Sequence, residues 1–142
     1  MRKLLLTIVA VATTNFIFSQ TVLGKWKTID DVTGEAKSIV EIYEQDGKVY
    51  GKVVKILTPG RENAVCDKCE GENKDKPILG MVILKDLVKD GDEWEDGEIL
   101  DPNNGKTYSC YITLEEDNKL KVRGYIGFSL IGRTQYWYRV EE

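Results

Sequence analysis

The sequence predicts an all-β protein, a single eight-stranded antiparallel up-and-down barrel that follows an N-terminal signal peptide. Beyond residue 20 the chain consists of short runs rich in β-branched and aromatic residues, separated by turn residues. Several runs alternate apolar and polar side chains, which is typical of a strand with one buried face. The chain shows no βαβ alternation and no internal repeat. Eight sequential hairpin strands remove their exposed edges by closing into a barrel.

The first 20 residues have the layout of a secretory signal peptide. Arg2 and Lys3 precede a short apolar run, and Ser19 offers a small residue for cleavage near Gln20. The apolar run breaks after about ten residues, whereas a membrane-spanning helix needs about 20. We therefore expect a signal peptide at residues 1–20 and a barrel domain at residues 21–142. The domain is expected in the periplasm or outside the cell, without stable membrane insertion.

Composition excludes several function classes. Cleavage after residue 20 would remove Arg2 and Lys3 and no acidic residue, so the formal net charge of −4 becomes −6. This charge argues against a nucleic-acid partner. The chain has no histidine, which excludes Ser-His-Asp and Cys-His nucleophile systems and histidine-ligated metals. We expect no catalytic site, no metal and no cofactor, and hence a protein that is not an enzyme.

The eight predicted strands follow from the alternating runs and the turns between them. The run at residues 79–88 also suits a short helix, because Leu, Met and Lys favour one. We predict a strand there because the neighbouring runs have hairpin-length connections. The predicted strands are Val22–Ile29, Ser38–Glu44, Lys48–Leu57, Leu79–Val88, Glu93–Leu100, Lys106–Glu115, Lys119–Ile126 and Arg133–Val140.

The connections predict a barrel with two unequal ends, because alternate connections of an up-and-down barrel lie at the same end. Those after the second, fourth and sixth strands are short polar turns. The others include the longest and least regular loops, and function in such barrels usually lies at the elaborate end. These longer connections are Asp30–Ala36, Thr58–Pro77, Asp101–Gly105 and Gly127–Gly132.

Two resemblances support the barrel. Gly24-Lys25-Trp26 resembles the Gly-x-Trp signature of lipocalins and other calycins. This resemblance implies a barrel whose closed end is capped by Trp26, packed under an arginine of the last strand. Arg139 is nearer to that end than Arg133, so the resemblance assigns the role to Arg139.

A longer match covers nearly all of residues 22–140. It looks like the bacterial family catalogued as domain of unknown function 2147, and implies an exported, lipocalin-like barrel without an assigned activity. The residues that carry it are Pro77-Ile78-Leu79-Gly80-Met81, Trp94, Gly97, Ile99-Leu100-Asp101-Pro102, Gly105-Lys106-Thr107-Tyr108, Arg123-Gly124-Tyr125-Ile126-Gly127, Gly132-Arg133-Thr134-Gln135 and Trp137.

Candidate ligand-binding residues gather around the predicted mouth. A guanidinium group near a barrel mouth can bind a carboxylate or phosphate in a bidentate manner. For Arg133 two interpretations stay open: such a role, or a structural role in pairing with Asp101 or stacking on an indole ring. Arg123 shares a face with Lys119 and Lys121, which favours a structural role. The candidates are Arg133, Arg123, Asp101, Asn103, Tyr125, Trp94 and Trp137.

Two further features of the mouth have simpler interpretations. The segment Asp101-Pro102-Asn103-Asn104-Gly105 has the residue order of a tight turn, so turn chemistry explains its carboxylate and amides. The apolar segment Phe128–Ile131 is predicted to plug or cover the barrel, rather than to probe a membrane, because exposed apolar side chains are costly without a partner.

The cysteines predict a structural disulfide. Cys66 and Cys69 lie in the longest loop, where a bridge between them would staple the chain in an oxidising compartment. A redox dithiol needs a helix N-terminus, and structural zinc needs four ligands. Cys110 shares a face with Ile112 and Leu114, which favours a buried free thiol. A bridge from Cys110 to the loop also stays open.

Three functions are compatible with these features. The first is a barrel that binds one small amphipathic or anionic ligand at its mouth. The second is a structural or protein-interaction domain of the envelope with a filled barrel. The third is an envelope redox or metal module that uses Cys66 and Cys69.

Overall fold

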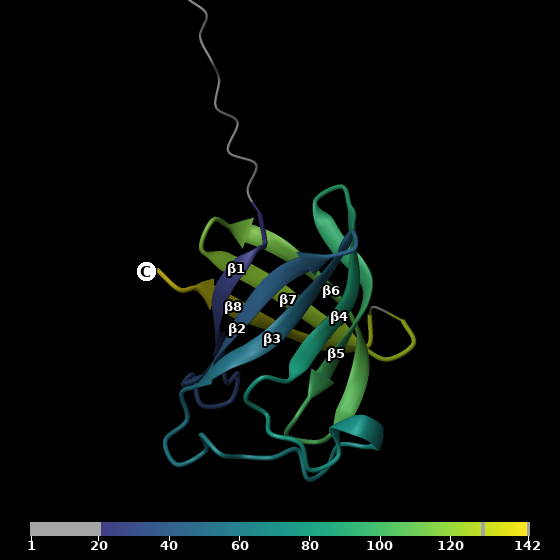
Figure 1. Cartoon of the computed structure of the whole chain (residues 1–142). Coiled ribbons are helices and arrows are strands. Elements are labelled where there is room, and N and C mark those ends of the chain that lie inside the picture. Colours follow the sequence, from purple (N-terminus) through teal and green to yellow (C-terminus); the bar gives the residue numbers. More distant parts are fainter. Residues whose placement is uncertain (1–20, 129, 142) are drawn as a thin grey trace, which may run out of the picture.

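The computed structural model describes residues 21–128 and 130–141 and shows a closed antiparallel barrel of eight strands (Figure 1). The strands pair in chain order, and β1 pairs with β8 to complete the ring. A 3-10 helix, η1 (Gly71–Asn73), lies in the β3–β4 connection. The strands are β1 (Gly24–Ile29), β2 (Ala36–Gln45), β3 (Lys48–Ile56), β4 (Val82–Asp90), β5 (Glu93–Asp101), β6 (Lys106–Glu116), β7 (Lys119–Tyr125) and β8 (Gly132–Arg139).

The predicted fold and strand order are confirmed. The run at residues 79–88 is a strand rather than a helix, although it starts only at Val82. Its first residues form a turn instead, because the Gly80 N–H donates to the Val53 carbonyl and the Met81 N–H to the Ile78 carbonyl. The predicted signal peptide at residues 1–20 lies outside the described residues. Among the described residues, no helix has the length and apolar character needed to cross a membrane.

Alternation determines which side chains face the interior. In β7, Leu120 and Val122 are buried, whereas Lys121 and Arg123 are half-buried on the outer face. In β6, the same alternation points Cys110 and Ile112 inward, and both are fully buried. The inward faces of all eight strands thus build one core.

The two ends of the barrel differ as the connection lengths predict. The turns between β2 and β3, β4 and β5, and β6 and β7 lie at one end, where β1 begins and β8 ends (Figure 1). The other end carries the long β3–β4 loop, the β1–β2 loop and the β5–β6 turn. We call the first the closed end and the second the open end.

Large side chains fill the closed end. The Trp26 indole is fully buried and donates through Nε1 to the Val22 carbonyl at 2.8 Å. The Arg139 guanidinium lies over this ring, with its central carbon 4.3 Å from the ring centroid. Arg139 also donates to the carbonyls of Leu23, Thr21 and Asp117. One side chain of the last strand therefore connects the start of the chain to the β6–β7 turn.

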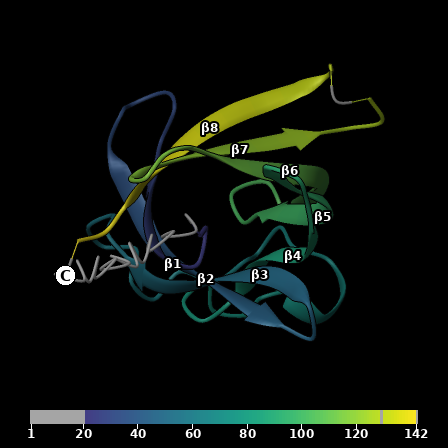
Figure 2. The ribbon, with the colours of Figure 1, turned by 90° about the horizontal axis from the view of Figure 1, so that it is seen from above.

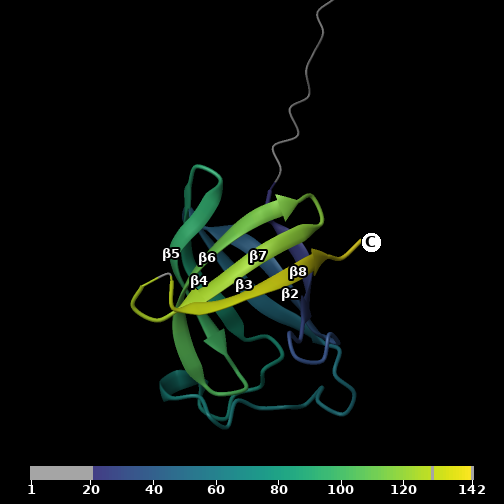
Figure 3. The ribbon, with the colours of Figure 1, turned by 180° about the vertical axis from the view of Figure 1, so that it is seen from behind.

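The β7–β8 loop stands away from the barrel (Figures 2 and 3). Phe128 is 76% exposed and Leu130 is 90% exposed. The prediction that this segment plugs or covers the barrel is wrong for Phe128 and Leu130, whose side chains stay outside the interior, although Ile131 lines the cavity wall.

Candidate functional site

A cavity of about 760 Å³ opens at the open end of the barrel. All eight strands contribute to its wall, together with the β1–β2 and β3–β4 loops. Its most deeply buried wall residues are Val53, Val122 and Trp137, each about 2% exposed. Below them the side chains around Trp26 close the barrel. The arrangement is a one-ended pocket with an apolar floor, which is the usual form of a small-molecule site.

Polar groups of the cavity wall satisfy one another. The hydroxyl oxygens of Thr28 and Ser38 lie 2.7 Å apart, and both residues line the wall. The Trp137 indole N–H points to Gln135 Oε1 at 3.5 Å. Among the described residues, no buried side-chain nitrogen or oxygen lacks a hydrogen-bond partner. The buried polar groups of the wall therefore need no polar ligand group to complete their hydrogen bonds.

Charged residues surround the entrance in equal numbers of each sign. A ring of this kind favours a polar or zwitterionic group at the rim, while the floor favours apolar atoms. The acidic members are Asp30, Glu35 and Asp101, and the basic members are Lys37, Arg61 and Arg133.

Arg133 is held by a residue that the sequence did not indicate. Its Nε and Nη2 donate to the two carboxylate oxygens of Asp31, in a bidentate pair. The pKa of Arg133 is raised, first by this hydrogen bond and then by the charges of Asp31, Asp101 and Asp30. The pair is solvent-accessible, with side-chain exposures of 57% and 30%. Asp31 thus orients Arg133 at the entrance, and the exposed guanidinium group could exchange Asp31 for an anionic ligand group.

The acidic side of the rim is fixed by turn chemistry. The N–H groups of Val32 and Thr33 donate to Asp30 and are the main cause of its lowered pKa, to which Lys37 and Arg133 add. Asp101 accepts from the Asn103 N–H at 2.9 Å, as the turn interpretation predicts. The suggested pairing of Arg133 with Asp101 is replaced by pairing with Asp31, because β1–β8 closure brings the β1–β2 loop beside Arg133.

The structure brings five of the seven candidate mouth residues to the cavity wall. These are Arg133, Asp101, Asn103, Tyr125 and Trp137. The Tyr125 ring lies 6.2 Å from that of Tyr111, centroid to centroid.

The other two candidates do not line this cavity. Arg123 donates to the Thr134 hydroxyl at 2.9 Å on the outer face of the sheet. Trp94 lies at the start of β5 near the closed end, where it packs against the core and under Lys89. A tryptophan two residues into a strand that starts at the closed end does not reach the mouth.

Several wall residues were missed by sequence reasoning. Tyr108 lines the cavity, and its hydroxyl accepts from the Asn104 side chain at 2.9 Å. Alternation could have found it, since it shares a face with Cys110. Thr28 shares a face with Trp26 in the same way. Lys37 and Arg61 had no such signal, because Lys37 precedes the predicted second strand, although it is the second residue of β2 in the structure, and Arg61 lies in the irregular β3–β4 loop.

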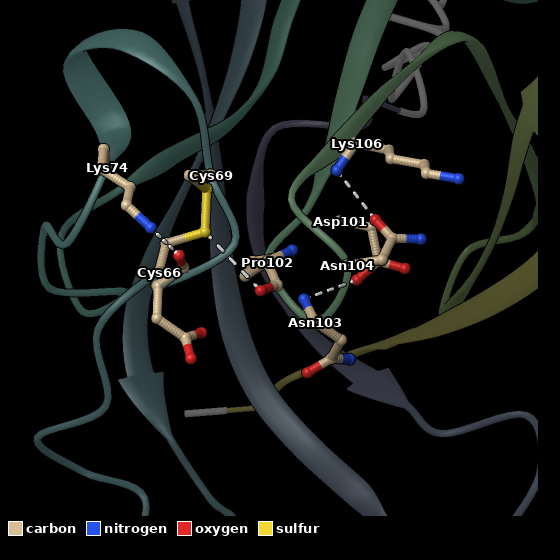
Figure 4. The surroundings of a disulfide bond; sticks show 9 residues. Cys66, Cys69, Lys74, Asp101, Pro102, Asn103, Asn104 and Lys106 are labelled. Atoms are coloured by element: carbon tan, nitrogen blue, oxygen red, sulfur yellow. Dashed lines mark hydrogen bonds between the residues drawn. A yellow bond between two sulfur atoms is a disulfide. The ribbon is translucent and has the colours of Figure 1, made fainter.

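The long β3–β4 loop forms one wall of the cavity and is stapled by a disulfide. Cys66 and Cys69 are bonded within the motif, with Cα atoms 5.3 Å apart (Figure 4). Backbone bonds from Cys66 to Lys76 and from Ile78 to Ala64 give the loop a hairpin-like frame. Ala64 and Ile78 then face the cavity.

The stapled loop rests on the β5–β6 turn. Cys66 Sγ lies 3.6 Å from the Pro102 carbonyl oxygen (Figure 4). Gly105 has φ +72°, and a methyl group there would lie 1.9 Å from the Lys68 carbonyl oxygen. This contact requires glycine both for its backbone conformation and for space. The disulfide-bonded β3–β4 loop therefore packs against the β5–β6 turn, and both contribute residues to the cavity wall.

The third cysteine is a buried thiol. Cys110 is fully buried and free, and desolvation raises its pKa to about 12. Among the described residues, no group of three or more Cys, Asp or Glu side chains is arranged to hold a metal ion.

Comparison with known proteins agrees with this architecture. The chain is similar to the solved structure of protein HP1028 from the human pathogen Helicobacter pylori, described as belonging to the lipocalin family. The TM-score is 0.76 at 21% identity, over 86% of this chain and 84% of that one. At this identity the similarity shows the fold alone. No curated protein matches the chain. The family model described as "Uncharacterized protein conserved in bacteria (DUF2147)" matches residues 24–139, and the chain therefore belongs to that family.

Proposed function

We propose that this barrel is a binding protein rather than an enzyme, and that it holds one small amphipathic ligand. The apolar part of the ligand occupies the cavity, and its polar group lies at the charged rim. The observation that carries this proposal is the one-ended cavity of about 760 Å³, which falls within the range of small-molecule sites, roughly 300–1,000 Å³.

The distribution of polar groups supports an amphipathic ligand. The hydroxyls of Thr28 and Ser38 bond to each other, so the interior presents mainly apolar contacts. Arg133 lies at the entrance, where its guanidinium would bind an anionic ligand group by sharing or exchanging Asp31. A monoacyl amphiphile, such as a fatty acid, fits both regions.

The same cavity disfavours a purely structural barrel, whose interior would be filled by its own side chains. A redox role has less support, because Cys66 and Cys69 stand in an irregular loop and not at the N-terminus of an α-helix. The disulfide instead anchors a wall of the cavity.

Native mass spectrometry tests the proposal directly. The purified protein would be incubated with fatty acids, lysophospholipids, haem and sugar acids. The mass of any retained protein–ligand complex would then be measured. We expect one bound amphiphile per chain. Retention of none of these compounds would overturn the proposal.

Gly124 offers a way to fill the cavity without disturbing the fold. It lines the wall, and a methyl group there would lie 3.4 Å from Ile99 and 3.7 Å from Tyr108, which are ordinary contacts. Gly124→Leu should project into the cavity and weaken fatty-acid binding by about tenfold or more, the equivalent of about 1.4 kcal/mol. Gly124→Ala is the matched control and should bind nearly as the wild type. Equal affinities for both variants would place the ligand elsewhere.

We propose further that the barrel works outside the cytoplasm. Two features support export: the charged and apolar layout of residues 1–20, and a disulfide suited to an oxidising compartment. Intact-mass analysis of protein recovered from the periplasm or medium should show loss of about 20 residues. A full-length mass confined to the cytoplasm would contradict export.

A further inference from the structure

The β7–β8 loop carries an unusual exposure of large apolar side chains. Ile126 and Ile131 are each 65% exposed, Phe128 is 76% exposed and Leu130 is 90% exposed. Residues 126–132 contain no charged residue, in a chain of which 31% is charged. Clustered exposure of this kind indicates a surface that meets a partner. We call these four side chains the apolar tip.

We propose that the apolar tip docks the barrel onto the surface of a neutral phospholipid bilayer. The tip projects sideways from the barrel beyond the neighbouring strands, so on that side it can reach a flat surface first (Figures 2 and 3). The docking is peripheral and reversible, because a few side chains at a loop tip enter only the interfacial region.

The base of the tip has the residues that suit a membrane interface. Tyr125 ends β7 beside Tyr111, and Lys121 lies 5.6 Å from the Tyr111 ring centroid. Tyrosine rings with flanking cations are enriched at the level of lipid headgroups, where an apolar ring and a polar hydroxyl are both satisfied. The order from tip to base is thus apolar, aromatic and then basic.

The apolar surface is continuous with the cavity. Ile126 and Ile131 belong both to the tip and to the cavity wall, whereas Phe128 and Leu130 belong to the tip alone. A docked tip would therefore bring the part of the cavity wall formed by Ile126 and Ile131 close to the bilayer. If the proposed function holds, an amphiphile would pass from the bilayer to the cavity along this surface.

Charge favours a neutral bilayer over an anionic one. The formal net charge is −4, and the charged residues that line the entrance are equal in number for each sign. Anionic headgroups would gain no net attraction from this balanced entrance and would be repelled by the chain as a whole, so apolar contact must supply the attraction. Because salt screens surface charges but not apolar contacts, vesicle binding should change little when the salt concentration is raised from about 50 to about 500 mM.

Co-sedimentation with phosphatidylcholine vesicles tests the docking. The wild-type protein should pellet with these vesicles, and adding phosphatidylglycerol should not increase binding. Phe128→Ser combined with Leu130→Ser should lower the partition coefficient at least tenfold. The matched control is Leu79→Ser with Val88→Ser, two apolar residues that are 47% and 41% exposed elsewhere. The proposal would be overturned if the wild-type protein stayed in the supernatant, a result that would favour a protein partner for the apolar tip. It would also be overturned if both double variants lost vesicle binding equally.

A site-specific label gives a second readout. Leu130→Cys can be labelled selectively with an environment-sensitive dye, because Cys110 is buried and the other cysteines are bonded. Its emission should rise severalfold with phosphatidylcholine vesicles, whereas a dye at Val88→Cys should not respond. Equal responses at both positions would contradict docking through the tip.

The docking and the ligand proposal can fail separately. Transfer of a fluorescent fatty acid from vesicles to the protein should be slower for the Phe128→Ser, Leu130→Ser variant, with its affinity in solution unchanged. Vesicle binding without fatty-acid binding would refute only the proposed function. Fatty-acid binding without vesicle binding would refute only the docking.

Discussion

At the residue scale, Arg133 shows how a charged side chain can be both oriented and available. Asp31 fixes its direction through a bidentate pair, yet more than half of the Arg133 side chain is exposed. Exposed pairs contribute about 0–1 kcal/mol to stability, so this pair is not needed for folding. Its position at the entrance is the reason to expect a role in binding.

Arg133→Ala should therefore separate binding from stability. We expect fatty-acid affinity to fall by about tenfold, equivalent to about 1.4 kcal/mol. The removed cation leaves Asp30, Asp31 and Asp101 to repel a carboxylate. Isothermal titration measures the affinity, and urea unfolding should show a change of less than about 1 kcal/mol. Affinity for a neutral monoacylglycerol serves as the control, and a loss equal to that of the fatty acid would contradict a charge effect.

Cys110 gives a prediction about pH. Its pKa is raised by burial from 9.0 to about 12, so the folded state keeps the thiol protonated when the unfolded state would ionise it. The contribution of this thiol to stability is complete below pH 9 and is lost as the pH rises toward 12. Urea unfolding between pH 8 and 11 should show a steeper decline for wild type than for Cys110→Ala, by at most about 1.4 kcal/mol per pH unit. Parallel declines would show that Cys110 does not titrate in this way.

At the element scale, the β3–β4 loop is a disulfide-bonded part of the cavity wall rather than a free connection. The Cys66–Cys69 bridge closes only a short loop, and the chain-entropy argument limits its contribution to about 2 kcal/mol. Its larger effect is local, because the loop rests on Gly105 and carries Ala64 and Ile78 into the cavity wall.

Replacing both bonded cysteines should loosen this loop and leave the barrel folded. For Cys66→Ser with Cys69→Ser we expect faster tryptic cleavage within residues 57–81 and weaker fatty-acid binding, with a stability loss of about 2 kcal/mol or less. Mass spectrometry locates the cuts, and wild-type protein treated with reductant provides the comparison. Loss of the whole β-sheet signal in circular dichroism would contradict a local role.

At the scale of the whole molecule, closure of the barrel joins distant parts of the chain. Arg139 contacts Trp26 and the carbonyls of Leu23, Thr21 and Asp117. Lysine cannot reproduce this fork of donors. The contact between β1 and β8 is consequently supported by a side chain as well as by backbone pairing.

Arg139→Lys should lower the free energy of unfolding by about 1–3 kcal/mol, because one ammonium group cannot lie over Trp26 and also reach all three carbonyls that the guanidinium group binds. Urea denaturation measures the change. Arg133→Lys, at the other end of the same strand, is the control and should change stability by less than about 1 kcal/mol. Equal effects of the two substitutions would show that the closed end has no special part in stability.

Sequence reasoning predicted the candidate site in part. Strand order and turn chemistry located Arg133, Asp101 and Asn103 near the open end, whereas Trp137, also assigned to the mouth, lies on the buried floor of the cavity. Trp94 was assigned to the mouth, although the predicted strand order already places it near the β4–β5 turn. Asp31 could not be paired with Arg133 in advance, because the two lie 102 positions apart and meet only when the barrel closes.

The sequence by itself determined the all-β class, the order of the strands and the difference between the two ends. These features depend on local patterns, namely alternation with period two and the chemistry of turns. Only the tertiary structure decided the size of the cavity, the partner of Arg133 and the exposure of the apolar tip. Each of these depends on where closure of the barrel places distant strands and loops, which no local pattern records.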